Sequence, residues 1–227
     1  MTFWSDFLSN DGRSAEKWAH YFPVYERHLA RFQNRRVTVL EIGCGRGGSL
    51  PLWSRYFGPD AQIVGIDIRP ECKEYEKHPV LVRIGNQSDP RFIDGIANEF
   101  GPFDVVLDDG SHVMSDITAS FRMLYPRMDR HGVYIVEDLH TAYWPQYGGG
   151  LRRQGSFVEI AKELIDELNG GDPTDMPLTE FAKSTASISF YNSMVVFERG
   201  PLLNRFAKEV GSGIDTTYHR IRLPTSP

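Results

Sequence analysis

Acidic side chains follow two short apolar runs in the sequence. One run ends in Asp108-Asp109, and the other ends in Glu137-Asp138. If the two runs are neighbouring parallel strands, their ends lie about 5 Å apart. Carboxylates so close together repel one another, and a hard divalent cation relieves the repulsion because it takes oxygen ligands. Helix capping would explain Asp109 or Asp138 singly but not both pairs. The pattern therefore predicts a site for Mg²⁺ or another hard divalent cation.

His112 follows Asp109 by three residues, at the start of a predicted helix. A neutral imidazole beside a metal site can take a proton from a bound hydroxyl group. A surface histidine is the alternative interpretation, and His140 is a weaker candidate for the same role. We predict that His112 is the general base.

A glycine-rich loop precedes both acid pairs. Gly43, Gly45 and Gly48 follow the first apolar run, and Asp67 lies about 20 residues further on. Small residues let the backbone turn sharply and approach a ligand closely, and Asp67 can accept the hydroxyl hydrogens of a ribose. The same spacing also satisfies the dinucleotide pattern G-x-G-x-x-G, so an NAD-dependent oxidoreductase remains an alternative.

Glu41 favours S-adenosylmethionine over NAD as the ligand of this loop. Its carboxylate lies two residues before the first glycine, where it can face a positively charged amino-acid group but would repel a pyrophosphate. Further contacts to this cofactor are predicted for Gly43, Gly45, Ser49, Asp67, Asn86, Gln87 and Asp108.

Alternating strands and helices must position these groups. Strands are predicted at 37–42, 62–67, 80–84, 103–108 and 132–137, and helices at 49–57, 89–99, 115–124 and 156–168. This alternation is typical of a mainly parallel sheet. Only Asn192-Ser193 separates the apolar stretches 187–191 and 194–199, which predicts an antiparallel hairpin. We therefore predict a doubly wound α/β fold with seven strands, mainly parallel, that ends in a hairpin.

The bulk composition is that of a globular chain. Its 227 residues suit one domain with extensions, and 41% are hydrophobic. The net charge of −5 and the absence of a basic run argue against a nucleic-acid partner. Two cysteines are too few for a disulfide framework or a thiolate zinc site. No leader or membrane span is apparent, so we expect a cytoplasmic protein.

Three segments together resemble the metal-dependent sugar O-methyltransferases of macrolide biosynthesis. They are Leu-Glu-Ile-Gly at 40–43, Asp-Asp-Gly-Ser-His at 108–112 and Val-Glu-Asp-Leu-His-Thr at 136–141. The glycine loop is common to class I methyltransferases, whereas the acid pairs with the histidine are more specific. The resemblance implies S-adenosylmethionine and Mg²⁺ as cofactors. The matching residues are Asp109, Glu137 and Asp138 for the metal, His112 for the base, and Glu41, Gly43 and Asp67 for S-adenosylmethionine.

The resemblance also implies an acceptor, a hydroxyl group of a sugar or of a glycosylated natural product. A loop at 139–155 could close over it, with Tyr143, Trp144 and Tyr147 stacked on the sugar. A catechol or phenol acceptor and a non-catalytic cofactor-binding protein remain alternatives, because a fold does not fix a function. We also expect a homo-oligomer.

The predicted organisation has three parts. Residues 1–35 form a helical arm, 36–200 an S-adenosylmethionine-dependent methyltransferase domain and 201–227 a tail. Within the arm, residues 14–33 carry apolar side chains at three- and four-residue steps, which predicts an amphipathic helix that Pro23 breaks or kinks.

Overall fold

The computed structural model describes residues 2–171 and 176–202, so most of the predicted tail lies outside the described residues. The strands are β1 (Thr38–Ile42), β2 (Gln62–Asp67), β3 (Val80–Ile84), β4 (Phe103–Asp108), β5 (Met128–Val136), β6 (Thr185–Tyr191) and β7 (Met194–Arg199). The helices are α1 (Phe3–Leu8), α2 (Phe22–Leu29), α3 (Ser49–Phe57), α4 (Pro90–Phe100), α5 (Met114–Leu124), α6 (Phe157–Leu168) and α7 (Glu180–Ser184). None of the helices in these residues is long and apolar enough to cross a membrane.

The seven strands form one sheet in the order β3-β2-β1-β4-β5-β7-β6, which confirms the predicted fold class. The pairs among β1 to β5 are parallel, and β7 runs antiparallel to both β5 and β6. Ile42 pairs with Asp108 across β1 and β4, and Asp108 pairs with Val136 across β4 and β5. The register therefore brings the carboxyl ends of these three strands to the same edge of the sheet.

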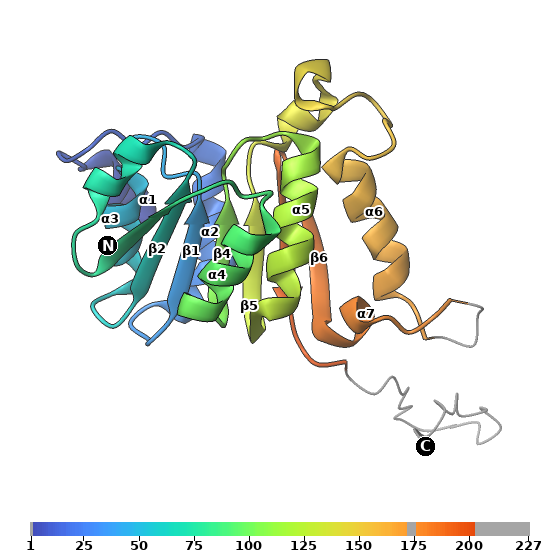
Figure 1. Ribbon diagram of the computed structural model, residues 1–227. Coiled ribbons are helices and arrows are strands. Elements are labelled where there is room, and N and C mark those ends of the chain that lie inside the picture. Colours follow the sequence, from blue (N-terminus) through green and yellow to red (C-terminus); the bar gives the residue numbers. More distant parts are fainter. Residues whose placement is uncertain (1, 172–175, 203–227) are drawn as a thin grey trace, which may run out of the picture.

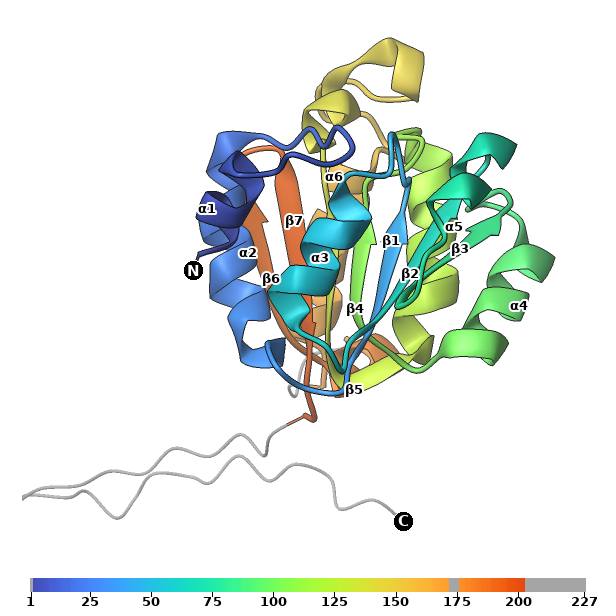
Figure 2. The same cartoon turned by 90° about the vertical axis from the view of Figure 1, so that its left-hand side faces the viewer.

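Helices cover both faces of the sheet (Figures 1 and 2). The helices α1, α2 and α3 pack on one face, and α4, α5 and α6 pack on the other. Successive strand residues alternate between the two cores, as the pleat requires. Val105 and Leu107 of β4 face α3, whereas Val106 faces α5. Asp108 is two residues after Val106 and therefore points to the same face of the sheet, toward α5.

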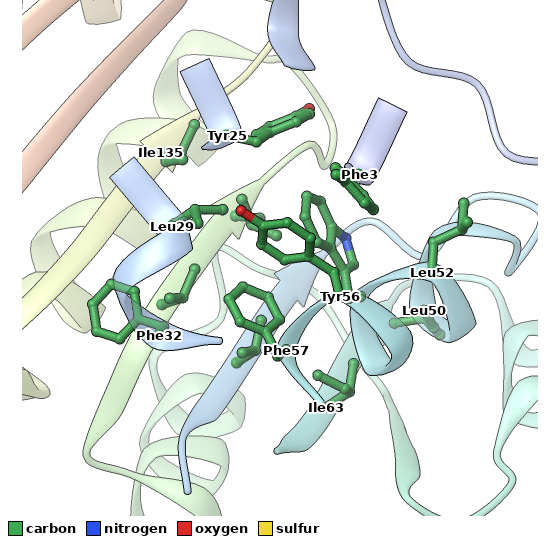
Figure 3. Packing of buried hydrophobic residues seen from close by; sticks show 14 of the residues in the cluster. Phe3, Tyr25, Leu29, Phe32, Leu50, Leu52, Tyr56, Phe57, Ile63 and Ile135 are labelled. Carbon is green, nitrogen blue, oxygen red and sulfur yellow. The ribbon is translucent and has the colours of Figure 1, made fainter. Parts of the chain in front are cut away.

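The N-terminal residues share the core of the sheet rather than forming a separate layer. Figure 3 shows Phe3 and Tyr25 packed among side chains of α2, α3, β2 and β5. The ring of Phe3 stacks on Trp53 of α3 with a centroid separation of 4.4 Å. Aromatic burial on this scale is a large apolar contribution to stability. The predicted division into three parts stays a prediction.

The single predicted helix over residues 14–33 is wrong. Residues 14–18 are irregular, a 3₁₀ turn follows at Ala19–Tyr21, and α2 begins at Phe22. Pro23 lies in the first turn of α2, where its missing N–H group has no helical partner to lose, so it starts the helix instead of kinking it. The irregular stretch crosses the end of the sheet at which the strand tips meet (Figure 2).

Candidate active site

A cavity of about 620 Å³ opens at the carboxyl ends of β1, β2, β4 and β5. This is the place where open α/β sheets bind ligands. It is lined by residues of the N-terminal stretch, the glycine loop and the strand tips: Ser14, Ala15, Glu16, Lys17, Trp18, Tyr21, Gly43, Cys44, Gly45, Arg46, Gly48, Ser49, Asp67, Ile68, Arg69, Asn86, Gln87, Asp109, Gly110, Ser111, His112, Asp116, Glu137 and Asp138.

The glycine loop is tightly fitted against the neighbouring strand tips. Gly43 has φ +89°, and a Cβ atom there would lie 2.2 Å from the backbone oxygen of Asp109, so only glycine fits. A Cβ atom on Gly48 would lie 2.4 Å from the backbone oxygens of Arg13 and Ser14. The loop therefore touches both the end of β4 and the N-terminal stretch, and it forms one wall of the cavity.

Asp67 lies at the end of β2 and faces the glycine loop. Its carboxylate accepts hydrogen bonds from the Gly45 N–H group at 3.2 Å and from the guanidinium of Arg69. Burial raises the pKa of Asp67, but the contacts with Arg69 outweigh it and hold the pKa below its usual value. An ionised carboxylate at this position suits a hydroxyl-rich ligand such as ribose.

The other predicted cofactor residues divide between the cavity wall and the layer behind it. Ser49 and Asn86 line the cavity. Glu41 is fully buried behind Ser49, whose hydroxyl donates to it at 2.6 Å, and it also accepts from the indole of Trp53 at 3.0 Å. Gln87 lines the cavity and accepts from the Ser111 N–H group at 2.8 Å.

Asp108 lies elsewhere than the sequence suggested. Its carboxylate points toward α5 and accepts hydrogen bonds from Ser120 at 2.6 Å, Tyr134 at 3.0 Å and Gln87 at 3.1 Å. Burial raises its pKa to about 6 although these three donors oppose the shift. Asp108 is not among the residues that line the cavity, because the pleat turns it to the opposite face from Glu41. We call this buried group and its three donors the Asp108 site.

Four carboxylates converge on the other side of the strand tips, and we call Glu41, Asp109, Glu137 and Asp138 the acid cluster. Backbone hydrogen bonds fix two of them, from Asp109 N to Ile42 O at 3.0 Å and from Glu137 N to Asp108 O at 2.9 Å. Glu137 is buried, and its Oε1 accepts from the hydroxyl of Tyr25 at 2.8 Å. Burial, together with the charge of Asp109, holds the pKa of Glu137 above its usual value although Lys17 opposes the shift.

A lysine of the N-terminal stretch reaches into the acid cluster. Lys17 Nζ lies 2.6 Å from Asp109 Oδ2, 2.8 Å from Glu137 Oε2 and 3.8 Å from Glu41 Oε1. Burial lowers the pKa of Lys17, but the surrounding carboxylates outweigh it and raise the pKa well above its usual value. Lys17 is therefore protonated, and its ammonium group partly neutralises the negative charge of the acid cluster.

Asp138 and His112 both adopt the left-handed backbone region, with φ +54° and φ +58°. Asp and His are among the residues that tolerate this region, and such conformations gather at functional sites. The hydroxyl of Tyr21 donates to Asp138 Oδ1 at 2.6 Å and holds its side chain in place. The imidazole Nε2 of His112 lies 3.9 Å from Asp109 Oδ1 and 3.8 Å from Asp138 Oδ2.

The side chains of Asp109, His112 and Asp138 each offer one ligand atom, and these atoms lie within 4.8 Å of one another. Two carboxylate oxygens and one imidazole nitrogen can hold a divalent cation. Glu137, the third predicted metal ligand, lies beside them on the cavity wall, but both its oxygens are engaged by Tyr25 and Lys17. The donor set therefore fits a hard cation, and the choice among these four ligands stays a prediction.

Of the predicted acceptor residues, the structure brings Tyr147 next to His112, with Trp144 beside it, and none of the three lines the cavity. The ring of Tyr147 lies 6.3 Å from that of His112, and Trp144 lies 6.1 Å from Tyr147. Trp144 and Tyr143 are each more than two-fifths exposed, and Tyr143 lines a second pocket that His140 also lines. His140 bonds to Ser193 at 2.7 Å rather than facing the acid cluster.

The sequence did not reveal Lys17, Tyr21 or Tyr25 as site residues. The two tyrosines fitted the apolar face of the predicted helix, where an aromatic ring is normally packing material. Lys17 is a single charged residue without a motif around it. The missing signal was three-dimensional, because all three side chains meet the acid cluster across more than 90 residues of sequence.

The chain is similar in sequence to named O-methyltransferases. The mycinamicin VI 2''-O-methyltransferase of Micromonospora griseorubida is 36% identical over 196 residues, which cover 80% of this chain and 48% of that protein. The 8-demethyl-8-(2-methoxy-alpha-L-rhamnosyl)-tetracenomycin-C 3'-O-methyltransferase of Streptomyces olivaceus is 36% identical over 203 residues, covering 82% and 52%. No family model matches the chain.

A solved structure shares the fold. The MycE methyltransferase of the mycinamycin pathway, in complex with Mg, SAH and mycinamycin VI, superposes with a TM-score of 0.78 at 32% identity. The match covers 88% of this chain and 53% of that one, so the chain spans about half the length of the relatives it matches. By sequence, the chain is therefore a homologue of the macrolide and sugar O-methyltransferases, and it has the class I methyltransferase fold.

Proposed function

We propose that this chain is an S-adenosylmethionine- and Mg²⁺-dependent O-methyltransferase, and that its acceptor is a hydroxyl group of a sugar or glycosylated natural product. The observation that carries the proposal is the position of His112, whose Nε2 faces two carboxylates at the opening of a cavity that begins at the glycine loop. The relatives named above are sugar O-methyltransferases, and one was solved with SAH and Mg.

The cofactor would lie along the glycine loop. Asp67 would accept the ribose hydroxyls, and this needs the guanidinium of Arg69 to give way on at least one carboxylate oxygen. Asn86 and Gln87 lie beyond Asp67 on the same wall, where they can meet the adenine. Glu41 contributes negative charge from behind Ser49, which favours a cationic donor.

Asp109, Glu137 and Asp138 would hold the metal, with His112 next to it. Bound Mg²⁺ would act as a Lewis acid toward the acceptor hydroxyl. His112 would accept the proton of that hydroxyl at Nε2 as the oxygen bonds to the methyl carbon, while the carbon–sulfur bond of the donor breaks and S-adenosylhomocysteine leaves. The carboxylates of Asp109 and Asp138 would stabilise the resulting imidazolium, since both lie within 4 Å of it.

The acceptor would enter past the loop at 139–155. The ring of Tyr147 lies near His112, with Trp144 beside it, and such rings pack well on the apolar face of a sugar. Tyr143 lines the neighbouring pocket and would contact a larger acceptor from there. A homo-oligomeric state is part of the same proposal.

A methyl-transfer assay tests the proposal. The chain is incubated with S-adenosylmethionine labelled in the methyl group and with glycosylated natural products that carry adjacent hydroxyls, with Mg²⁺ or with EDTA. We expect label in an acceptor sugar with Mg²⁺ and none with EDTA. Transfer that is insensitive to EDTA would contradict the metal role. Retention of NAD⁺ instead of S-adenosylmethionine in equilibrium dialysis would favour the oxidoreductase alternative.

A further inference from the structure

The ammonium group of Lys17 occupies the middle of the acid cluster. It lies within hydrogen-bond distance of Asp109 Oδ2 and Glu137 Oε2, at 2.6 and 2.8 Å, and its side chain is only 5% exposed. A buried charge is stable only where it is paired. Lys17 therefore neutralises two of the three carboxylates that are proposed to hold Mg²⁺.

The oxygens that Lys17 uses are hard-cation ligands. Of the two carboxylate oxygens of Glu137, one accepts from Lys17 and the other from Tyr25. A divalent cation on Glu137 Oε2 and Asp109 Oδ2 would lie next to an ammonium that is itself less than 3 Å from both atoms. Two positive charges at that separation in a buried site repel one another strongly.

Lys17 reaches the acid cluster from a part of the chain that no helix or strand fixes. Residues 14–18 are irregular, and the next side chain, Trp18, is more than half exposed. The lysine side chain is long and unbranched, so its charged end can leave the carboxylates while its stem stays on the cavity wall.

We propose that Lys17 is the resident counter-ion of the acid cluster and that a divalent cation takes its place, so that the Lys17 contacts and cation binding exclude each other. This inference rests on the proposed metal site. Lys17 then keeps Asp109 and Glu137 together in the metal-free protein. It also sets the affinity for the cation, because the cation must compete with a tethered charge.

Calorimetric titration with Mg²⁺ and with Mn²⁺ tests the exclusion. Lys17→Met removes the competing charge and keeps the length of the side chain. We expect the variant to bind either cation about tenfold more tightly or better. If Lys17 pairs with the carboxylates in about 90% of the metal-free molecules, only the remaining tenth can bind the cation, and the apparent affinity is weakened tenfold. Lys162→Met is the matched control, since Lys162 lies half-exposed on α6 and pairs only with Glu159 among the residues described. It should bind as the unmodified chain does.

The outcomes separate this inference from the proposed function. Equal or weaker binding by Lys17→Met, with clear binding by the unmodified chain, would overturn the role of Lys17 and leave the metal site standing. Absence of binding by both proteins would overturn the metal site and this inference together.

Chemical labelling of the unmodified chain gives a second test that does not depend on the folding of the variant. Lysines are acetylated under limiting reagent, with and without saturating Mg²⁺, and the rate at each lysine is followed by mass spectrometry. We expect Mg²⁺ to accelerate the labelling of Lys17 several-fold, because the displaced amine enters the open cavity, while Lys162 stays constant. A Lys17 rate that Mg²⁺ leaves unchanged or lowers would overturn the inference.

Discussion

Asp108 and Asp109 are neighbours in sequence at the end of β4, yet their surroundings differ completely. Asp108 is buried among neutral donors, the hydroxyls of Ser120 and Tyr134 and the amide of Gln87. Asp109 faces the cavity in the acid cluster, and its partner is the charged ammonium of Lys17. The pleat of one strand thus separates two regions that both contain buried carboxylates.

The difference teaches how a structural carboxylate can be told from a chemical one. The neutral donors of the Asp108 site give each of its two oxygens at least one hydrogen bond, and Asp108 does not line the cavity. The acid cluster holds several carboxylates against one lysine, and it borders an open cavity. An excess of negative charge beside open space is an arrangement that a cation can complete. Substitutions in the two regions should therefore affect activity and stability in different proportions.

The largest effect is expected from Asp109→Asn. The amide keeps the shape but removes the charge, and the loss of Lewis-acid assistance of several kcal/mol corresponds to a fall in kcat of about 10³-fold. Steady-state kinetics with the labelled donor measures it, and Mg²⁺ titration should show weakened binding. Asp60→Asn, at an exposed turn, is the control. If Asp109→Asn keeps full Mg²⁺-dependent turnover, Asp109 has no catalytic role and the acid cluster, like the Asp108 site, only stabilises the fold.

A smaller loss is expected from His112→Ala. General-base catalysis usually contributes 10²–10⁴-fold, so we expect kcat to fall by about 10²-fold or more. Mg²⁺ affinity should not change, because the carboxylates hold the metal. A parallel fall in Mg²⁺ affinity would instead assign His112 to the metal, as the short separation of its ligand atom from those of Asp109 and Asp138 allows.

A matched pair of tyrosines compares the two regions directly. Tyr25→Phe removes the hydroxyl that donates to Glu137, and Tyr134→Phe removes one that donates to Asp108. Both rings are fully buried, so each variant should lose about 1–3 kcal/mol in the free energy of unfolding, measured by denaturant titration. Only Tyr25→Phe should also lower activity, by about tenfold, because partners of metal ligands tune the site. Equal turnover by Tyr25→Phe and Tyr134→Phe would contradict the functional difference between the acid cluster and the Asp108 site.

The sequence was sufficient for the sheet because each of its strands carries its own signal, whereas α1, α7 and the break before α2 were not predicted. The apolar runs ending at Ile42, Asp67 and Ile84 gave those strand ends correctly, and Asn192-Ser193 marked the hairpin. Burial of a parallel strand leaves a continuous apolar run that is visible without coordinates.

The acid pairs were predictable for the same reason, since parallel strands end at one edge. The direction of each side chain was not. Which of Asp108 and Asp109 faces the cavity depends on the pleat, and a shift of one residue exchanges the two faces. The contribution of Lys17 depends on an irregular stretch, whose path no periodic pattern records.

The smallest effect on activity is expected at Glu198, a carboxylate outside both regions. It tests whether pairing with a positive side chain is by itself enough to identify a functional acid. Glu198 of β7 lies 3.3 Å from both His28 Nδ1 and Arg31 Nη1, outside the cavity. The hydrogen bond with His28 is the main cause that lowers its pKa to about 2. A lowered pKa in the folded state stabilises the fold above the unfolded value of about 4.3, and this stability disappears as the pH falls toward 2.

Glu198→Gln should therefore destabilise the chain by about 1–2 kcal/mol at pH 7, a value reduced for the partial exposure of the pair. The difference from the unmodified chain should shrink as the pH is lowered from 5 to 3 in urea titrations. Glu180→Gln, an exposed glutamate of α7, should show no such pH dependence. Turnover should stay unchanged, because a paired carboxylate without open space beside it has nothing to bind. A loss of turnover in Glu198→Gln would mean that charge pairing, and not the cavity, distinguishes the acid cluster from the Asp108 site.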